Sequence, residues 1–218
     1  DLVEQATAEV VVLLGLLAEE RRAWLMGADA MRIEDHALLS DGTNVALVDP
    51  EGSVVWMCHP APDSGAVFAA LLGGPSAGML AVHPVSAKRP LSQAYVPSTM
   101  SVRTRWAGLD VIDFLDRSHR GDPVRSDQTR LVRVLTGTEP ARIVFSPRPE
   151  FGQVPVHLVA DELGVRVEGS AEPMVLKVTG ASWDIHREGM HEVAVAVVDP
   201  ANGPCVVELR CGTGDLGD

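Results

Sequence analysis

The sequence has few cysteines, and their number argues against a disulfide-stapled fold. Cys58, Cys205 and Cys211 are an odd number, in a chain of 218 residues that is long enough to bury a core without disulfides. Reduced thiols are therefore expected, which favours a cytoplasmic protein. The spacing alone leaves a disulfide between Cys205 and Cys211 open.

Positive charge and long hydrophobic runs are also scarce. The chain has 18 basic and 30 acidic residues, so its formal net charge is −12. This charge repels phosphate backbones and anionic lipids, and neither nucleic acid nor a membrane is an expected partner. The apolar stretch at residues 10–18 is too short to span a bilayer, and it follows acidic residues, unlike a secretory signal.

Motifs for metal or cofactor chemistry are missing. His186, Glu188 and His191 include two histidines five apart across a Glu-Gly pair, whereas a helical zinc motif needs them four apart, so a hairpin is predicted here. The glycine-rich residues 72–78 lack the Lys-Ser/Thr ending of a phosphate loop, and the Gly-x-Gly-x-x-Gly match at 212–217 has no helix after it. No metal or cofactor is expected in this chain.

Short alternating runs broken by Gly, Pro, Asn and Asp predict a mainly β fold, a large antiparallel two-sheet sandwich. One short helix is predicted over residues 66–72, with Asp63 or Ser64 capping its first turn. The predicted strands are 45–48, 54–58, 79–84, 93–96, 101–107, 109–114, 128–136, 141–147, 156–160, 164–169, 174–179, 185–188, 191–198 and 204–211.

The first thirty residues differ from the rest. Apolar residues at helical spacing over 2–26 predict an amphipathic helix, so the expected organisation is an N-terminal helical segment, 1–30, and a β-sandwich domain, 31–218. The polar stretch 117–127 is predicted to be an exposed loop. Because the first residue is Asp, we expect a processed product, a trimmed chain or a segment of a longer polypeptide.

Motifs spread from residue 33 onward resemble the amino-terminal domain of bacterial and archaeal glucoamylases and trehalases of glycoside hydrolase family 15. The matching residues are Ile33, Asp35, Ala37, Leu38, Asp41, Ala46, Leu47, Val48, Gly52, Ser53, Trp56, Cys58, Pro60, Asp63, Ser64, Val67 and Phe68, followed by Tyr95-Val-Pro-Ser-Thr99, Val111-Ile-Asp-Phe114, Leu131-Val-Arg133, Pro147-Arg148 and Phe151-Gly152.

This resemblance implies a supersandwich-like domain that carries no catalytic residues itself. The family's catalytic domain, an (α/α)6 helical barrel with two glutamates, would follow this region and is absent from the chain. The implied role is to support hydrolysis of α-glucosidic bonds, in trehalose or short α-glucans, by packing on that barrel, with homo-oligomer formation as a further expectation. The alternative is a stand-alone module that binds carbohydrate or protein. Ala61, Pro62 and Gly65 favour it, because the family has Arg-Phe and Pro at these places.

The loop after the Trp-bearing strand holds the candidate contact residues. Trp56 can stack on a sugar ring and Asp63 can accept hydrogen bonds from its hydroxyls, with His59 and Ser64 beside them. The competing interpretation places Trp56 in the core and Asp63 at a helix cap. Arg148, held between two prolines, is expected to form a structural ion pair or a domain-interface contact.

Overall fold

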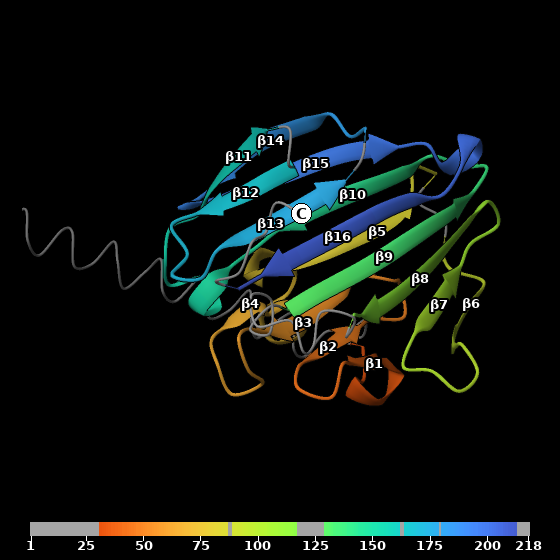
Figure 1. Cartoon of the computed structure of the whole chain (residues 1–218), viewed down its shortest axis with the longest axis horizontal. Coiled ribbons are helices and arrows are strands. Elements are labelled where there is room, and N and C mark those ends of the chain that lie inside the picture. Colours follow the sequence, from red (N-terminus) through yellow and green to blue (C-terminus); the bar gives the residue numbers. More distant parts are fainter. Residues whose placement is uncertain (1–30, 87–88, 117–128, 162–163, 179, 213–218) are drawn as a thin grey trace, which may run out of the picture.

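The chain folds into two antiparallel β-sheets that face each other across one core. The computed structural model describes residues 31–86, 89–116, 129–161, 164–178 and 180–212. In Figure 1, strands of one sheet lie over strands of the other. The prediction of a mainly β sandwich is confirmed.

Sheet 1 is the layer that contains β3, the strand that carries Trp56. Its strands follow the order β1-β2-β3-β5-β10-β15-β14, and β4 pairs with β3 outside this path. The bounds are β1 (Ala37–Ser40), β2 (Val45–Val48), β3 (Val54–Cys58), β4 (Ala66–Phe68), β5 (Met79–Pro84), β10 (Ala141–Ser146), β14 (Trp183–Glu188) and β15 (His191–Val198).

Sheet 2 covers the other side of the core. Its order is β11-β12-β13-β16-β9-β8-β7-β6. The bounds are β6 (Ser92–Tyr95), β7 (Val102–Arg105), β8 (Leu109–Leu115), β9 (Thr129–Gly137), β11 (His157–Asp161), β12 (Gly164–Glu168), β13 (Met174–Val178) and β16 (Cys205–Cys211). The short helical turns are η1 (Ile33–Asp35), α2 (Ala70–Gly73), η2 (Pro75–Ala77), η3 (Pro149–Gly152) and η4 (Pro200–Asn202).

Alternation of apolar side chains produces these strands. In β8, buried and half-buried residues alternate from Leu109 to Leu115, because successive side chains of a strand point to opposite faces. The register places Val111 opposite Leu135 of β9, and Leu131 of β9 lies opposite Leu209 of β16. The apolar faces of both sheets therefore line one core, in which Phe68 meets Phe145 edge to face at a centroid distance of 6.3 Å.

Polar side chains tie the two sheets together at their edges. The Tyr95 hydroxyl of β6 accepts a hydrogen bond from the Leu38 N–H of β1 and donates one to the Leu38 carbonyl, at 2.8 and 3.0 Å. Oε2 of Glu192 in β15 accepts from the Leu158 N–H of β11 at 2.7 Å. The sandwich is thus closed by specific contacts as well as by its core.

Every strand predicted from the sequence is present, with small shifts at the ends. Two strands, β1 and β4, were not predicted, because they are only four and three residues long and have little room for alternation. The hairpin predicted over the two histidines is also confirmed, since Glu188 of β14 pairs with His191 of β15.

The helix predicted over residues 66–72 is wrong in its first half. Residues 66–68 form β4, whose side chains are all buried, and Phe68 pairs with Met57 of β3. Only Ala70–Gly73 is helical, and its N-cap is Ala69, without a side-chain cap from Asp63 or Ser64. Val67 and Phe68 are strand formers, and pairing with β3 outweighs the helical propensity of the alanines in this stretch.

Two further predictions fall on residues that the structure does not describe. The amphipathic helix over residues 2–26, with the proposed division into 1–30 and 31–218, lies in the first of these segments. The exposed loop over 117–127 lies in another. Both stay predictions.

Candidate functional site

Trp56 lies on the outer face of sheet 1, outside the main core. Its neighbours Val54 and Met57 point into the sandwich, whereas the half-buried indole packs with a small cluster of Cys58, Ala66 and Ala69. Its ring centroid lies 6.1 Å from that of Phe151, with the planes tilted by 53°. The interpretation of Trp56 as a residue of the main core is therefore wrong.

Phe151 presents its ring to solvent from an unusual backbone. It is 51% exposed, and both Glu150 and Phe151 have positive φ angles, 54° and 57°. Residues with side chains seldom adopt this conformation, which often marks functional sites. The Glu150 carboxyl lies against the backbone of Gly65, where a Cβ on that glycine would meet it. Gly65 thus lets the β3–β4 loop and η3 approach each other closely.

The side chains of the β3–β4 loop point in two directions: His59 points into the molecule and Asp63 points into solvent. The buried imidazole of His59 points toward sheet 2, where its Nδ1 lies 2.8 Å from Thr129 Oγ1, and the Asn44 side-chain amide donates to the same oxygen. Asp63 is exposed at the tip. Ser64 serves the loop itself, since its Oγ accepts from the Ala61 N–H at 3.2 Å. His59 therefore braces the loop from inside, while Asp63 faces outward.

Arg148 is a structural brace. It is only 2% exposed and donates to the carbonyls of Ser76, Pro147 and Glu192 at 3.2, 2.9 and 3.4 Å. Its Nη2 also lies 3.2 Å from Oε2 of Glu188. Burial lowers the pKa of this guanidinium. Because its donors already meet partners, Arg148 supports η3 and the β14–β15 hairpin and is not open to a ligand.

His191 stands next to this brace. Among the described residues, its buried Nδ1 finds no hydrogen-bond partner. Burial, together with the positive charge of Arg148, lowers the pKa of His191. The half-buried imidazole of His191 thus lies beside η3.

Taken together, Trp56, Phe151 and the loop that carries Asp63 lie at one surface of the molecule. His59 and Arg148 lie beneath this surface and support it.

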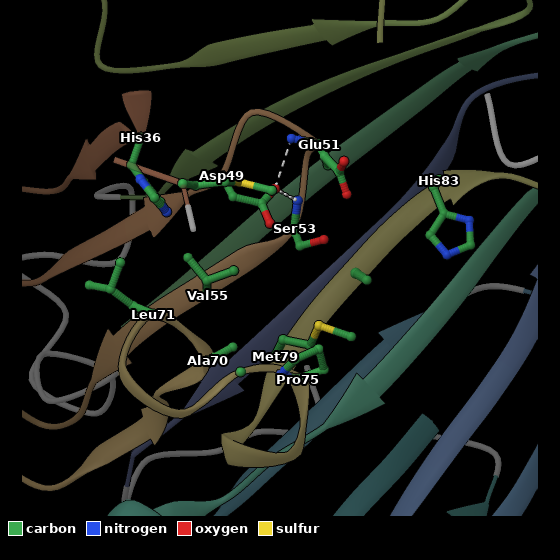
Figure 2. A pocket seen from close by; sticks show the side chains of 13 residues that line it. His36, Asp49, Glu51, Ser53, Val55, Ala70, Leu71, Pro75, Met79 and His83 are labelled. Atoms are coloured by element: carbon green, nitrogen blue, oxygen red, sulfur yellow. Dashed lines mark hydrogen bonds between the residues drawn. The ribbon is translucent and has the colours of Figure 1, made fainter. Parts of the chain in front are cut away.

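A cavity that the sequence did not predict lies on the outer face of sheet 1. Its volume is about 320 Å³. In β5, Leu80 and Val82 point into the core, so Met79, Ala81 and His83 face this cavity. Figure 2 shows most of the remaining lining: His36, the β2–β3 turn with Asp49, Glu51 and Ser53, Val55 of β3, Ala70 and Leu71 of α2, and Pro75 of η2.

Asp49 is the fixed polar group of this cavity. Its Oδ1 accepts hydrogen bonds from the N–H groups of Glu51 and Ser53, at 3.0 and 2.8 Å. Burial raises the pKa of this carboxyl despite these bonds. The Asp-Pro-Glu-Gly turn was visible in the sequence. The cavity was not, because α2 and β5, which complete it, come from later in the chain.

No group of three or more His, Cys, Asp or Glu in the described ranges is arranged to hold a metal ion. In the same residues, no helix is both long and apolar enough to cross a bilayer. Cys58, Cys205 and Cys211 are all free thiols. Cys205 and Cys211 stand at opposite ends of β16, roughly 20 Å apart at the rise of an extended strand, so the disulfide left open above does not form.

Comparison with known proteins adds a family relationship. Residues 19–218 match the family model described as "Trehalase-like, N-terminal". The chain is 34% identical over 138 residues to a trehalase of Mycobacterium tuberculosis (strain ATCC 25618 / H37Rv), and 33% identical over 138 residues to a trehalase of Mycolicibacterium smegmatis (strain ATCC 700084 / mc(2)155). Each match covers 55% of this chain and 20% of the relative, so the chain matches a fifth of the length of these relatives.

Proposed function

Because the chain belongs to the trehalase-like N-terminal family, we propose that it is the non-catalytic amino-terminal domain of a trehalase-like glycoside hydrolase. It supports the cleavage of α-glucosidic bonds, in trehalose or short α-glucans, by packing on a helical-barrel catalytic domain. The main support is how little of each related trehalase the chain matches: 80% of each relative's length lies outside the matched region.

The surface formed by Trp56, Phe151 and Asp63 is the proposed contact with that domain. A half-exposed phenylalanine ring on a positive-φ backbone costs free energy both in solvation and in conformation. Such a ring gains most when a partner covers it, and aromatic anchors commonly dominate interfaces. Asp63 supplies an exposed carboxyl on the β3–β4 loop, which approaches η3 closely at Gly65.

The acids at this surface do not suit catalysis. Glycoside hydrolysis generally needs two carboxyl groups flanking the scissile bond, one of them protonated by virtue of an apolar setting. Asp63 and Glu150 are both exposed. This supports the proposal that the acid and the base belong to another domain.

The first experiment asks whether the chain needs a catalytic domain. The purified chain is incubated with trehalose and glucose release is measured; none is expected. The coding region is then read past the codon for Asp218, where we expect a long helical segment with paired glutamates. Glucose release by the chain alone, or a coding region without such a segment, would contradict the proposal.

The second experiment tests the contact surface in the longer protein. Phe151→Ala is expected to lower kcat/KM for trehalose about tenfold, because an interface anchor typically contributes more than 1 kcal/mol. Leu91→Ala is the matched control, since Leu91 is 74% exposed and belongs to the opposite sheet's edge region. Equal activity of the two variants would remove Phe151 from the interface.

A stand-alone binding module is the second candidate. It is favoured by three residues of the β3–β4 loop, Ala61, Pro62 and Gly65. They stand where glycoside hydrolase family 15 usually has arginine, phenylalanine and proline. Trehalose and maltose are titrated calorimetrically against the chain and against Asp63→Ala. Saturable heat that this substitution abolishes would support a sugar site at the loop, and an absence of heat with both sugars would exclude it.

A further inference from the structure

The cavity on the outer face of sheet 1 combines an acidic rim with apolar walls. Asp49 and Glu51 lie at the β2–β3 turn, and Val55, Leu71 and Met79 supply apolar surface around the space. Its volume of about 320 Å³ is at the lower end of the range of roughly 300–1,000 Å³ that is usual for small-ligand pockets. A compact ligand with an apolar part therefore fits.

The Asp49 carboxylate lacks a countercharge from the described part of the chain. It is only 7% exposed, and the turn backbone occupies Oδ1 but not Oδ2. None of the ion pairs between described residues includes Asp49, and the charge of His36 lowers the pKa of this carboxyl less than burial raises it. Buried carboxylates are normally paired, as Asp113 is with Arg133 in this same fold.

We propose that this cavity binds an organic cation, an ammonium or guanidinium group carried on a short apolar stem. The cationic head lies at Asp49, where Oδ2 accepts its N–H groups and Glu51 adds a second negative charge at the rim. The stem lies against Leu71 and Met79. The inference stands independently of the proposed glycosidase role.

The charge balance selects this ligand class over a sugar. A neutral polyol leaves the buried carboxylate uncompensated, whereas a cation removes the cost of burying it. The net charge of −12 also raises the local concentration of cations around the whole chain. Two sources share this chemistry: a free small amine, and a basic side chain of a neighbouring protein domain.

The test uses n-butylammonium and n-butylguanidinium as probes, titrated calorimetrically and followed by NMR shifts of the His36 and His83 imidazoles. Saturable binding of either cation is expected, with no binding of n-butanol or butyrate. Acetyl-Ala-Lys-Ala-amide is titrated in parallel. Tighter binding of this peptide than of n-butylammonium assigns the site to a basic side chain, and the reverse assigns it to a free amine. Binding of butanol as tight as that of the cations would overturn the proposal.

Variants separate the charge from the fold. Asp49→Asn keeps an Oδ1 acceptor for the turn and is expected to weaken cation binding roughly tenfold or more. Leu71→Lys places an ammonium in the cavity and is expected to abolish probe binding, whereas Leu72→Lys, at an exposed neighbouring position that does not line the cavity, should leave it intact. If Asp49→Asn folds and binds the probes as tightly as the unchanged chain, the proposal is overturned. If Asp49→Asn does not fold, unchanged binding by Leu71→Lys overturns it.

Discussion

Arg133 of β9 and Asp113 of β8 form an ion pair that is completely enclosed between the two sheets. Nε of Arg133 lies 2.7 Å from Oδ1 of Asp113, and both side chains have no exposed surface. The guanidinium also donates to the carbonyls of Leu80, at 2.7 Å, and of Gly52, both of which belong to sheet 1 or its turn. One side chain therefore joins the two layers through the middle of the core.

Removing Arg133 should destabilise the fold strongly. Arg133→Met leaves the Asp113 carboxylate buried without a countercharge, and we expect a loss of about 3–5 kcal/mol in the free energy of unfolding. Urea denaturation measures it. The double variant Arg133→Met/Asp113→Leu should recover part of the loss, because no charge is then left in the core. A double variant less stable than the single one would contradict this account.

Gly52 is expected to tolerate no side chain. It has φ +87°, and an added Cβ would lie 2.7 Å from the ring of the buried Trp106. Gly52→Ala should therefore cost about 2–4 kcal/mol, from backbone strain and overpacking together. Gly189→Ala isolates the backbone part, about 1 kcal/mol, because Gly189 has φ +63° and no atom within 4 Å of the added Cβ. The stability of the two variants is compared by thermal unfolding. If Gly52→Ala and Gly189→Ala lose the same stability, a clash with Trp106 is excluded.

Glu192 should make stability depend on pH. The hydrogen bond from the Leu158 N–H lowers the pKa of Glu192 in the folded state. The Glu192 carboxylate therefore stabilises the folded state at pH values above its pKa in the unfolded chain. This stabilisation is lost as the pH falls through its lower pKa in the folded state. We expect Glu192→Gln to cost about 0.5–1 kcal/mol at pH 7 and nearly nothing at the acid end of a urea titration series. The exposed Glu168→Gln is the control, and the same pH profile for both variants would contradict the assignment.

The cysteines should react as three separate thiols. Burial raises the pKa of all three, so little thiolate is present in the native chain. A thiol reagent should label half-buried Cys205 first and Cys58 and Cys211 only slowly, and unfolding should release three equivalents. Release of only one equivalent from the unreduced, unfolded chain would instead indicate a Cys205–Cys211 disulfide.

Much of the fold was predictable because the signals are local. The alternation of buried and half-buried residues in β8, and the Asp-Pro-Glu-Gly turn between β2 and β3, are readable within a few residues. The candidate site was predicted only in part. Trp56 and the Asp63 loop do lie at one surface, but the exposed ring of Phe151 that completes it depends on positive φ angles at Glu150 and Phe151, which are not glycines.

The sequence by itself determined most of the strand pattern, the family and the absence of the usual metal and phosphate motifs. Only the tertiary structure decided that His59 and Arg148 turn inward as supports, that residues 66–68 pair as a strand, and that Asp49 borders a cavity. The physical reason is range: hydrophobic alternation acts between neighbours in the chain. The partners of a buried polar group lie tens of residues away, as Arg133 and Gly52 do, and only the packed sheets bring them together.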